Sequence, residues 1–243
     1  ETQCIPIGVR PAPGHMGTVN LPLPSDPCSY NEPDISDKPA WMRDLPAQDP
    51  NALRVLYNQR LAALRALDDL VGTVVTALQQ TGRLERTALL FTSDNGYLLG
   101  QHRWKSKVLV YEESIRVPLV LRRPGNASPP SVGAMVLNND LAPTILALAG
   151  ASPDPGHVMD GRSLLPLLDG TATHWRQRFL VDFPPPPLSL DPPSPDWDLM
   201  GEGQGGADIP AYVAVRTGAS GGLLAHTVYS ETMDATGAVM APW

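Results

Sequence analysis

The sequence contains only two cysteines among its 243 residues, Cys4 and Cys28. Two thiols at this spacing fit no metal-site pattern, which excludes a cysteine-based zinc module. They could form one disulfide in an oxidising compartment, so cysteine usage leaves the compartment open.

Long hydrophobic runs and excess positive charge are also absent. No stretch of about 18 apolar residues occurs, so we expect no segment that spans a bilayer. The first residues lack the basic-then-apolar layout of a signal peptide. The net charge of -7 disfavours nucleic acid and anionic membrane surfaces as partners, because both require clustered Lys and Arg.

Apolar residues make up 42% of the chain, which is enough for a sizeable core. Between residues 51 and 81 they recur at three- and four-residue steps, which predicts one long helix. Asp49 is a suitable cap before Pro50, and Gly82 is a suitable C-terminal stop. The periodic positions are Leu53, Tyr57, Leu61, Leu64, Leu67, Val71, Val74 and Leu78.

Short apolar runs follow the helix. Residues 87–92 (TALLFT) predict a strand buried on both faces, as in a parallel sheet covered by helices. Residues 117–121 predict a second strand in which Pro118 marks an edge or a strand start, and residues 135–137 are expected to extend the sheet. Asn139 or Asp140 is expected to cap a helix through residue 148, and a helical turn is expected over residues 163–168. This alternation predicts an α/β fold with a mixed sheet sandwiched by helices.

The composition divides the chain into three parts. Residues 1–183 are expected to form the main domain. Residues 184–210 are rich in Pro and Gly and predict a loop or linker. Residues 211–243 are expected to begin a small strand subdomain, with strands over residues 212–217 and 223–229 in a possible hairpin arrangement.

The triplet Asp94-Asn95-Gly96 follows the predicted strand of residues 87–92 directly. In open α/β sheets, ligands bind beyond the carboxyl ends of strands. A carboxylate and an amide oxygen at that place suit a hard divalent cation such as calcium. The same triplet is also a common turn, so the motif alone leaves both interpretations open.

Lys107 comes thirteen residues after Asp94, within a run that includes Arg103 and Lys105. An ammonium group near a divalent cation is costly unless an anion lies between them. If these groups converge, a sulfate or phosphate ester is the natural occupant, and the lysine would neutralise developing charge. By itself a lone lysine, or a charge run of this kind, is more often a solvated surface.

The sequence as a whole resembles the type I sulfatases of the alkaline phosphatase superfamily, especially their glucosamine-6-sulfatase-like and arylsulfatase branch. The resemblance covers roughly residues 11–217, with a gap across the Pro-rich loop. It corresponds to the carboxy-terminal part of the family's catalytic domain. The matching segments are residues 31–41 (NEPDISDKPAW), 67–71 (LDDLV), 91–100, 111–125, 139–145 (NDLAPTI), 160–168 (DGRSLLPLL), 175–176 and 214–217.

The resemblance implies that Asp94 and Asn95 are two calcium ligands and that Lys107 contacts the sulfate, with a catalytic role. It places His102 where many relatives carry a histidine near the pocket, which gives a substrate-binding role or a packing role. Lys105 has no family counterpart, and His15 corresponds to a structural position. The fold, a sulfated sugar or aryl sulfate substrate, and a secreted, periplasmic or lysosomal location are likewise expectations from the family.

The family hydrolyses sulfate esters with a formylglycine made in a C-x-P-x-R motif. Cys4-Ile5-Pro6 begins like that motif, but the next arginine is Arg10, two residues too late. We therefore expect that this polypeptide lacks the nucleophile, is a fragment of the family's domain, and is inactive alone. The missing amino-terminal part of the same protein is then a candidate partner.

Two other functions remain open. The chain could be a non-catalytic remnant that binds sulfated glycans, or a phosphoesterase of the same superfamily. The latter would carry an upstream Ser or Thr nucleophile and extra His ligands, which these residues do not show.

Overall fold

The computed structural model describes residues 9–24, 28–125, 131–183 and 209–218, and the backbone of residues 228–233 and 239–242. The chain forms two compact units. Unit 1 comprises Glu1–Leu84, Gly96–Leu109 and Pro187–Ile209. Unit 2 comprises Glu85–Asn95, Val110–Pro186 and Pro210–Trp243. Cys4 and residues 184–208 lie outside the described residues, so a disulfide to the exposed Cys28 and the proposed three-part division stay predictions.

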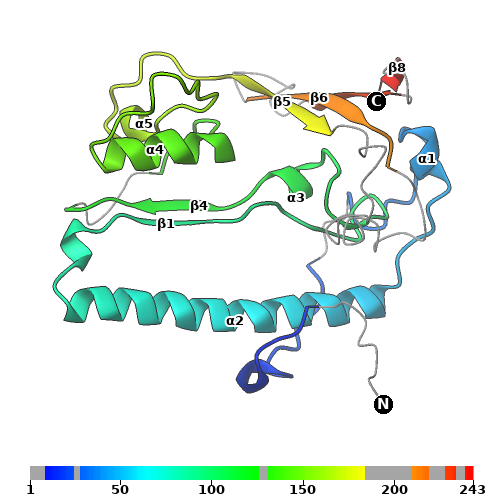
Figure 1. Cartoon of the computed structure of the whole chain (residues 1–243). Helices are drawn as coiled ribbons and strands as arrows, with labels where there is room; N and C mark the ends of the chain where they lie inside the picture. Colours follow the sequence, from blue (N-terminus) through cyan, green and yellow to red (C-terminus); the bar gives the residue numbers. More distant parts are fainter. Residues whose placement is uncertain are drawn as a thin grey trace, which may run out of the picture. The chain divides into compact units, whose positions relative to one another are not determined.

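The long element of unit 1 is helix α2, Pro50–Gln80, the cyan helix of Figure 1. The side chain of Asp49 accepts a hydrogen bond from the Asn51 N–H, as its predicted cap role requires. Gly82 has φ +64°, the left-handed conformation that ends a helix most easily in glycine. The sequence-predicted helix is therefore confirmed at both ends.

Four short elements accompany α2 in unit 1. The 3-10 helix η1, Pro13–His15, is joined to α2 by a 2.8 Å contact between His15 Nε2 and Asp69 Oδ2. Helix α1 covers Ala40–Arg43. Strands β2 (Leu98–Leu99) and β3 (Lys105–Ser106) pair antiparallel as a hairpin. The unit's most buried side chains are Met42, Leu53, Leu98, Trp104 and Leu109.

The short 3-10 turn η2 (Leu84–Arg86) spans the boundary between the units in the chain, and unit 2 contains the first sequence-predicted strands. Strand β1 covers Leu89–Thr92 and pairs antiparallel with β4, Leu119–Arg122. The expectation of parallel pairing with both faces buried is thus wrong, since Phe91 is 39% and Val120 58% exposed. Pro118 lies just before β4, in agreement with a strand start. Helix α3, Glu112–Ile115, lies between these two strands in the chain.

The helices of unit 2 follow β4 along the chain. A 3-10 turn, η3 (Asn138–Asp140), leads into α4 (Leu141–Leu148), and α5 covers Leu165–Leu168. Asp140 occupies the N-cap position of α4, but its carboxylate bonds elsewhere rather than capping the helix. Residues 135–137 are irregular, so the predicted extension of the sheet there is wrong. Their backbone instead receives side-chain hydrogen bonds, described below.

A four-stranded antiparallel sheet completes unit 2 in the order β5-β6-β7-β8. The strands are Arg178–Phe183, Tyr212–Thr217, Val228–Met233 and Val239–Pro242. Phe183 stacks on Tyr212 at 5.3 Å between ring centroids, and burial raises the pKa of the Tyr212 hydroxyl. The predicted strand over residues 212–217 is confirmed, and β7 is its antiparallel neighbour; of the predicted partner strand, residues 223–229, only residues 228 and 229 lie in the described part, and both belong to β7. Residues 219–227 are outside the described part.

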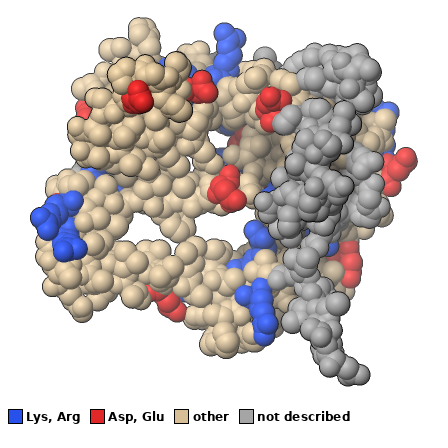
Figure 2. Space-filling model, in the orientation of Figure 1, with Lys and Arg blue, Asp and Glu red and all other residues tan. Residues whose placement is uncertain are grey.

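These elements confirm the α/β class, built here from helices and small antiparallel sheets. The search of the described helices found none that is long and apolar enough to cross a bilayer. On the face shown in Figure 2, the Lys and Arg residues are scattered among neutral and acidic ones rather than joined in one basic surface.

Candidate functional site

The turn after β1 carries the two predicted cation ligands. Asp94 is exposed and Asn95 is half-buried. Asp94 Oδ1 accepts a 2.8 Å hydrogen bond from the Asn95 N–H, and Ser93 Oγ donates to the Asn95 carbonyl at 2.9 Å. The turn is therefore held by its own short side chains, with the carboxylate facing outward from the strand end.

The donor set of this turn fits part of a calcium site. A carboxylate retains acceptor positions beyond the one used by Asn95, and a side-chain amide offers a neutral oxygen. Calcium takes about six to eight oxygen ligands, so two neighbouring residues cannot complete its shell. Within the described residues no cluster of three or more His, Cys, Asp or Glu side chains is suited to a metal ion.

A second residue group supports the same turn within unit 2. Asn138 Nδ2 donates to the Asp94 carbonyl oxygen at 3.1 Å. Asp140, two residues later, is fully buried and forms a bidentate pair with the Arg176 guanidinium. The turn of Asp94 is thus linked to η3, which is in turn fixed by a buried ion pair.

The predicted sulfate contact, Lys107, lies in unit 1 directly after β3. Its carbonyl oxygen accepts a 3.4 Å hydrogen bond from the Trp104 indole, and Trp104 itself is 2% exposed. Trp104 packs edge-on against Trp41, with 5.8 Å between ring centroids. The backbone that presents Lys107 is therefore anchored in the core of its unit, while the lysine itself is half-buried.

The hairpin before Lys107 has an uncommon backbone. His102 and Arg103 both have positive φ, 53° and 56°. Such conformations cost non-glycine residues roughly 1–2 kcal/mol each, so other contacts must hold them. Gly100, at φ +101°, has no room for a side chain, because an added Cβ would lie 2.6 Å from Leu53 Cδ1.

His102 makes a specific contact that its predicted substrate role did not include. Its Nδ1 lies 2.9 Å from Glu32 Oε2, and the imidazole side chain is only 14% exposed. Glu32 also accepts from the Lys38 ammonium at 3.1 Å. Burial lowers the pKa of Lys38, but hydrogen bonds to Asp37 and Glu32 outweigh burial and hold the pKa above its ordinary value. Nδ1 of His102 is therefore engaged with Glu32.

Arg103 ties the hairpin to the segments on both sides of α1. Its guanidinium donates to three backbone carbonyls, those of Glu32, Pro33 and Leu45, at 2.9 to 3.1 Å. Asn31 adds a further link, since its N–H donates to the Gly100 carbonyl. Sequence reasoning gave Glu32, Arg103 and Asn31 no role in the site. The signal that could have found them is the likeness of residues 31–41 to the family.

The predicted site residues thus fall into two groups. Asp94 and Asn95 belong to unit 2, whereas His102 and Lys107 belong to unit 1. The roles of all four residues stay predictions. That the two groups face one pocket remains a prediction.

Comparison with known proteins bears on both groups. The family model described as Sulfatase matches residues 24–151, which include all four predicted site residues. An arylsulfatase of Volvox carteri is 39% identical over 188 residues, 72% of this chain and 28% of that protein. Human N-acetylglucosamine-6-sulfatase is 41% identical over 129 residues, 52% of this chain and 23% of that protein.

A solved structure shows the same likeness. It is a protein in complex with its substrate D-glucosamine-2-N,6-O-disulfate, 25% identical, with TM-score 0.59, covering 81% of this chain and 36% of that chain. The chain therefore spans about a quarter of the length of these curated relatives. Since the family model covers more than half of the 243 residues, the chain belongs to the sulfatase family.

Proposed function

We propose that this chain supplies the cation-binding and sulfate-binding part of a sulfuric ester hydrolase that acts on sulfated sugars or aryl sulfates. In this proposal Asp94 and Asn95 are ligands of a calcium ion, and Lys107 contacts the sulfate. His102 would assist in substrate binding through Nε2.

The observation that carries the proposal is the place of Asp94 and Asn95. They follow directly after β1, inside the segment matched to the sulfatase family, and they offer the oxygen donors that a hard cation prefers. The turn is already ordered by its own hydrogen bonds, so little rearrangement is needed to present the carboxylate. The likeness to arylsulfatases and to N-acetylglucosamine-6-sulfatase supports the substrate class.

Each residue has a distinct task. A bound divalent cation would polarise the ester oxygens and offset their charge. Asp94 and Asn95 would hold that cation at the strand end. The Lys107 ammonium would hold a sulfate oxygen and neutralise negative charge that develops on the ester, a contribution that is strongest where water is excluded. The hydrogen-bonded carbonyl of Lys107 holds the backbone from which its side chain extends.

Attack on sulfur requires a nucleophile. Neither cysteine of this sequence lies in a C-x-P-x-R motif, because Cys4 has Gly8 and Cys28 has Glu32 four residues later. We therefore propose that the 243-residue polypeptide binds sulfate but does not turn over an aryl sulfate by itself. A non-catalytic module that holds sulfated glycans would behave in the same way. Calcium-dependent turnover of p-nitrophenyl sulfate by the pure chain would contradict this part.

The sulfate-binding role is tested with matched variants. We expect Lys107→Ala to weaken binding of inorganic sulfate in the presence of calcium by about tenfold, because a charge-assisted hydrogen bond contributes roughly 1.5–3 kcal/mol. Lys105→Ala is the control, since it removes the same charge two residues away on β3. Equal effects of the two substitutions would show that only overall charge matters and would refute the assignment.

The cation role has its own control. Asp94→Asn removes the charge while keeping an oxygen that can accept from the Asn95 N–H. Asp154→Asn makes the same change in another exposed turn, where Asp154 Oδ1 accepts from the Gly156 N–H at 2.9 Å. Only the Asp94 variant should lose the calcium dependence of sulfate binding.

The relative affinity for phosphate tests the alternative function. Tighter binding of phosphate than of sulfate would favour a phosphoesterase of the same superfamily.

A further inference from the structure

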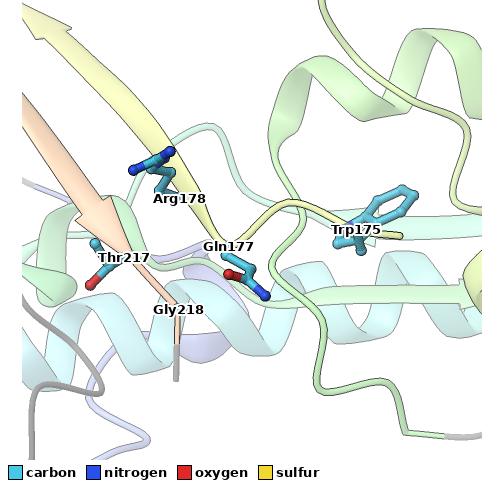
Figure 3. Close-up of a pocket in the computed structure, with 5 residues that line it drawn as sticks. All are labelled: Trp175, Gln177, Arg178, Thr217 and Gly218. Atoms are coloured by element: carbon cyan, nitrogen blue, oxygen red, sulfur yellow. The ribbon is translucent and has the colours of Figure 1, made fainter. Parts of the chain in front are cut away.

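A pocket of about 450 Å³ opens in unit 2 at the edge of the four-stranded sheet. Figure 3 shows that Trp175 and Gln177 come from the segment that enters β5 and Arg178 from the first residue of that strand, whereas Thr217 and Gly218 come from the end of β6. This volume lies in the range of roughly 300–1,000 Å³ that is usual for small-molecule sites. None of these five residues belongs to the predicted cation or sulfate site.

Several hydrogen bonds fix the walls of this pocket. The Trp175 indole N–H donates to the Met135 carbonyl at 2.6 Å, and the Gly218 N–H donates to the Gln177 carbonyl at 2.6 Å. Arg178 and Thr217 are paired across β5 and β6, so their side chains lie on the same face of the sheet. The walls are thus preformed.

The pocket is polar and carries one positive charge. Arg178 is the only ionisable residue of the lining. It is exposed, and within the described part of the chain no carboxylate forms an ion pair with it. The neighbouring Arg176 differs, because its guanidinium is neutralised by the buried carboxylate of Asp140. A local positive charge on a chain of net charge -7 selects for an anion.

We propose that this pocket binds an anionic sugar unit, such as a sulfated or carboxylated saccharide. A guanidinium recognises a tetrahedral or planar oxyanion through two parallel N–H donors. The Gln177 amide and the Thr217 hydroxyl can each donate to and accept from sugar hydroxyls. Trp175 is the half-buried aromatic residue of the lining, and the Arg176 guanidinium lies 5.2 Å from its ring centroid.

The pocket lies within reach of the turn that holds Asp94. Residues 135–138 connect the two, since Met135 accepts from Trp175 and Asn138 donates to the Asp94 carbonyl. Three residues of extended chain span at most about 11 Å, which limits the distance between the Met135 and Asn138 Cα atoms. An oligosaccharide whose sulfate contacts the cation held by Asp94 could therefore place another unit in the pocket. This extension rests on the proposed function, whereas anion binding by the pocket does not.

The test is a fluorescence titration of the full chain with D-glucosamine-2-N,6-O-disulfate at low protein concentration, with calcium and again with EDTA. We expect Arg178→Glu to weaken binding about tenfold or more under both conditions, and Arg178→Lys to weaken it less because the charge remains. The matched control is Arg86→Glu, which reverses an exposed arginine elsewhere in unit 2. Circular dichroism checks that each variant is folded, and N-acetylglucosamine is the uncharged probe.

Three outcomes would overturn the assignment: no binding by the unaltered chain, equal losses in the Arg178→Glu and Arg86→Glu variants, or equal affinity for the uncharged sugar. The assignment of the pocket and the assignment of Lys107 can each fail without the other. If Arg178→Glu weakens binding in EDTA while Lys107→Ala has no effect on sulfate binding in calcium, the pocket stands and the sulfate assignment of Lys107 fails. The reverse pattern supports Lys107 and refutes the pocket.

Discussion

The ion pair between Asp140 and Arg176 allows a quantitative test of how unit 2 is held together. Asp140 is 0% exposed and also accepts hydrogen bonds from the backbone N–H groups of Leu137 and Arg162, each at 2.8 Å. Substitution of Arg176 by Met keeps most of the side-chain volume but removes both guanidinium donors. The carboxylate then remains buried with only its two backbone donors.

The expected cost follows from that unbalanced charge. Removing one partner of a buried pair costs about 3–5 kcal/mol. A loss of 1 kcal/mol lowers the thermal unfolding midpoint by roughly 2–4 °C for a chain of this size. The midpoint of Arg176→Met should therefore fall by about 6–20 °C. Arg123→Met is the control, because its partner Asp169 is 49% exposed and such surface pairs contribute only about 0–1 kcal/mol.

The stability lost in the Arg176→Met variant should also depend on pH. Burial raises the pKa of Asp140, but hydrogen bonds from Arg176 and from the Arg162 and Leu137 N–H groups outweigh it and hold the pKa below its ordinary value. A depressed carboxyl pKa stabilises the fold above the unfolded value of about 3.9. That stabilisation is lost as the pH falls through the folded value. The difference between unaltered chain and variant should therefore shrink below about pH 4.

Urea denaturation and thermal unfolding, followed by far-UV circular dichroism at low protein concentration and at pH 7 and about pH 3, measure both effects. The reasoning is refuted if Arg176→Met loses no more stability at pH 7 than Arg123→Met. A loss that is the same at both pH values would show that packing, not charge, is responsible.

Three glycine substitutions should separate crowding from conformational freedom in the same urea assay. Gly161→Ala should cost about 1–3 kcal/mol or more, because its Cβ would overlap the backbone carbonyl of Asn139, which cannot rotate away. Gly100→Ala should cost at least about 1–2 kcal/mol from its φ of +101°, in addition to the contact with Leu53. Gly72→Ala should instead stabilise the chain by about 0.5–1 kcal/mol, since it lies inside α2 with nothing within 4 Å. A destabilising Gly72→Ala, or harmless changes at the other two, would contradict the geometry.

Helix α2 could be predicted from the sequence because its signals are local. The apolar spacing, the cap at Asp49 and the stop at Gly82 each act within one or two turns of the chain. The strand at residues 89–92 was also found, but its direction of pairing was not. Antiparallel pairing with β4 joins residues about 30 positions apart, and an apolar run carries no information about such a partner.

In the candidate site, too, local signals could be read from the sequence, whereas contacts between distant residues could not. Asp94 and Asn95 could be found because they directly follow an apolar strand, and the position of Lys107 came from family likeness. The supports of the hairpin could not be derived, since Glu32 and His102 are 70 residues apart. Positive φ at two consecutive non-glycine residues is equally invisible in sequence, because it is imposed by contacts such as those of Arg103 with three distant carbonyls.

The apolar stripe of α2 has a further consequence for behaviour in solution. The periodic apolar positions lie on one face of α2, and Leu53 is 1% exposed. The later positions Leu64, Leu67, Val71 and Val74 are 38–52% exposed. An apolar patch of this kind on a folded surface promotes association with other molecules. We therefore expect the chain to self-associate as its concentration rises.

Sedimentation velocity over a range of concentrations tests this expectation. The double variant Leu67→Lys, Val74→Lys should remain monomeric where the unaltered chain associates, because two charges on one apolar stripe cannot be desolvated cheaply. Arg65→Lys with Asp68→Glu is the control, since both residues lie beside Leu67 in the chain but keep their charge. A chain that stays monomeric throughout, with a sharp reversible melt, would mean that the exposed apolar residues of α2 do not drive association. In that case their regular spacing reflects helix formation alone and not the burial of one face.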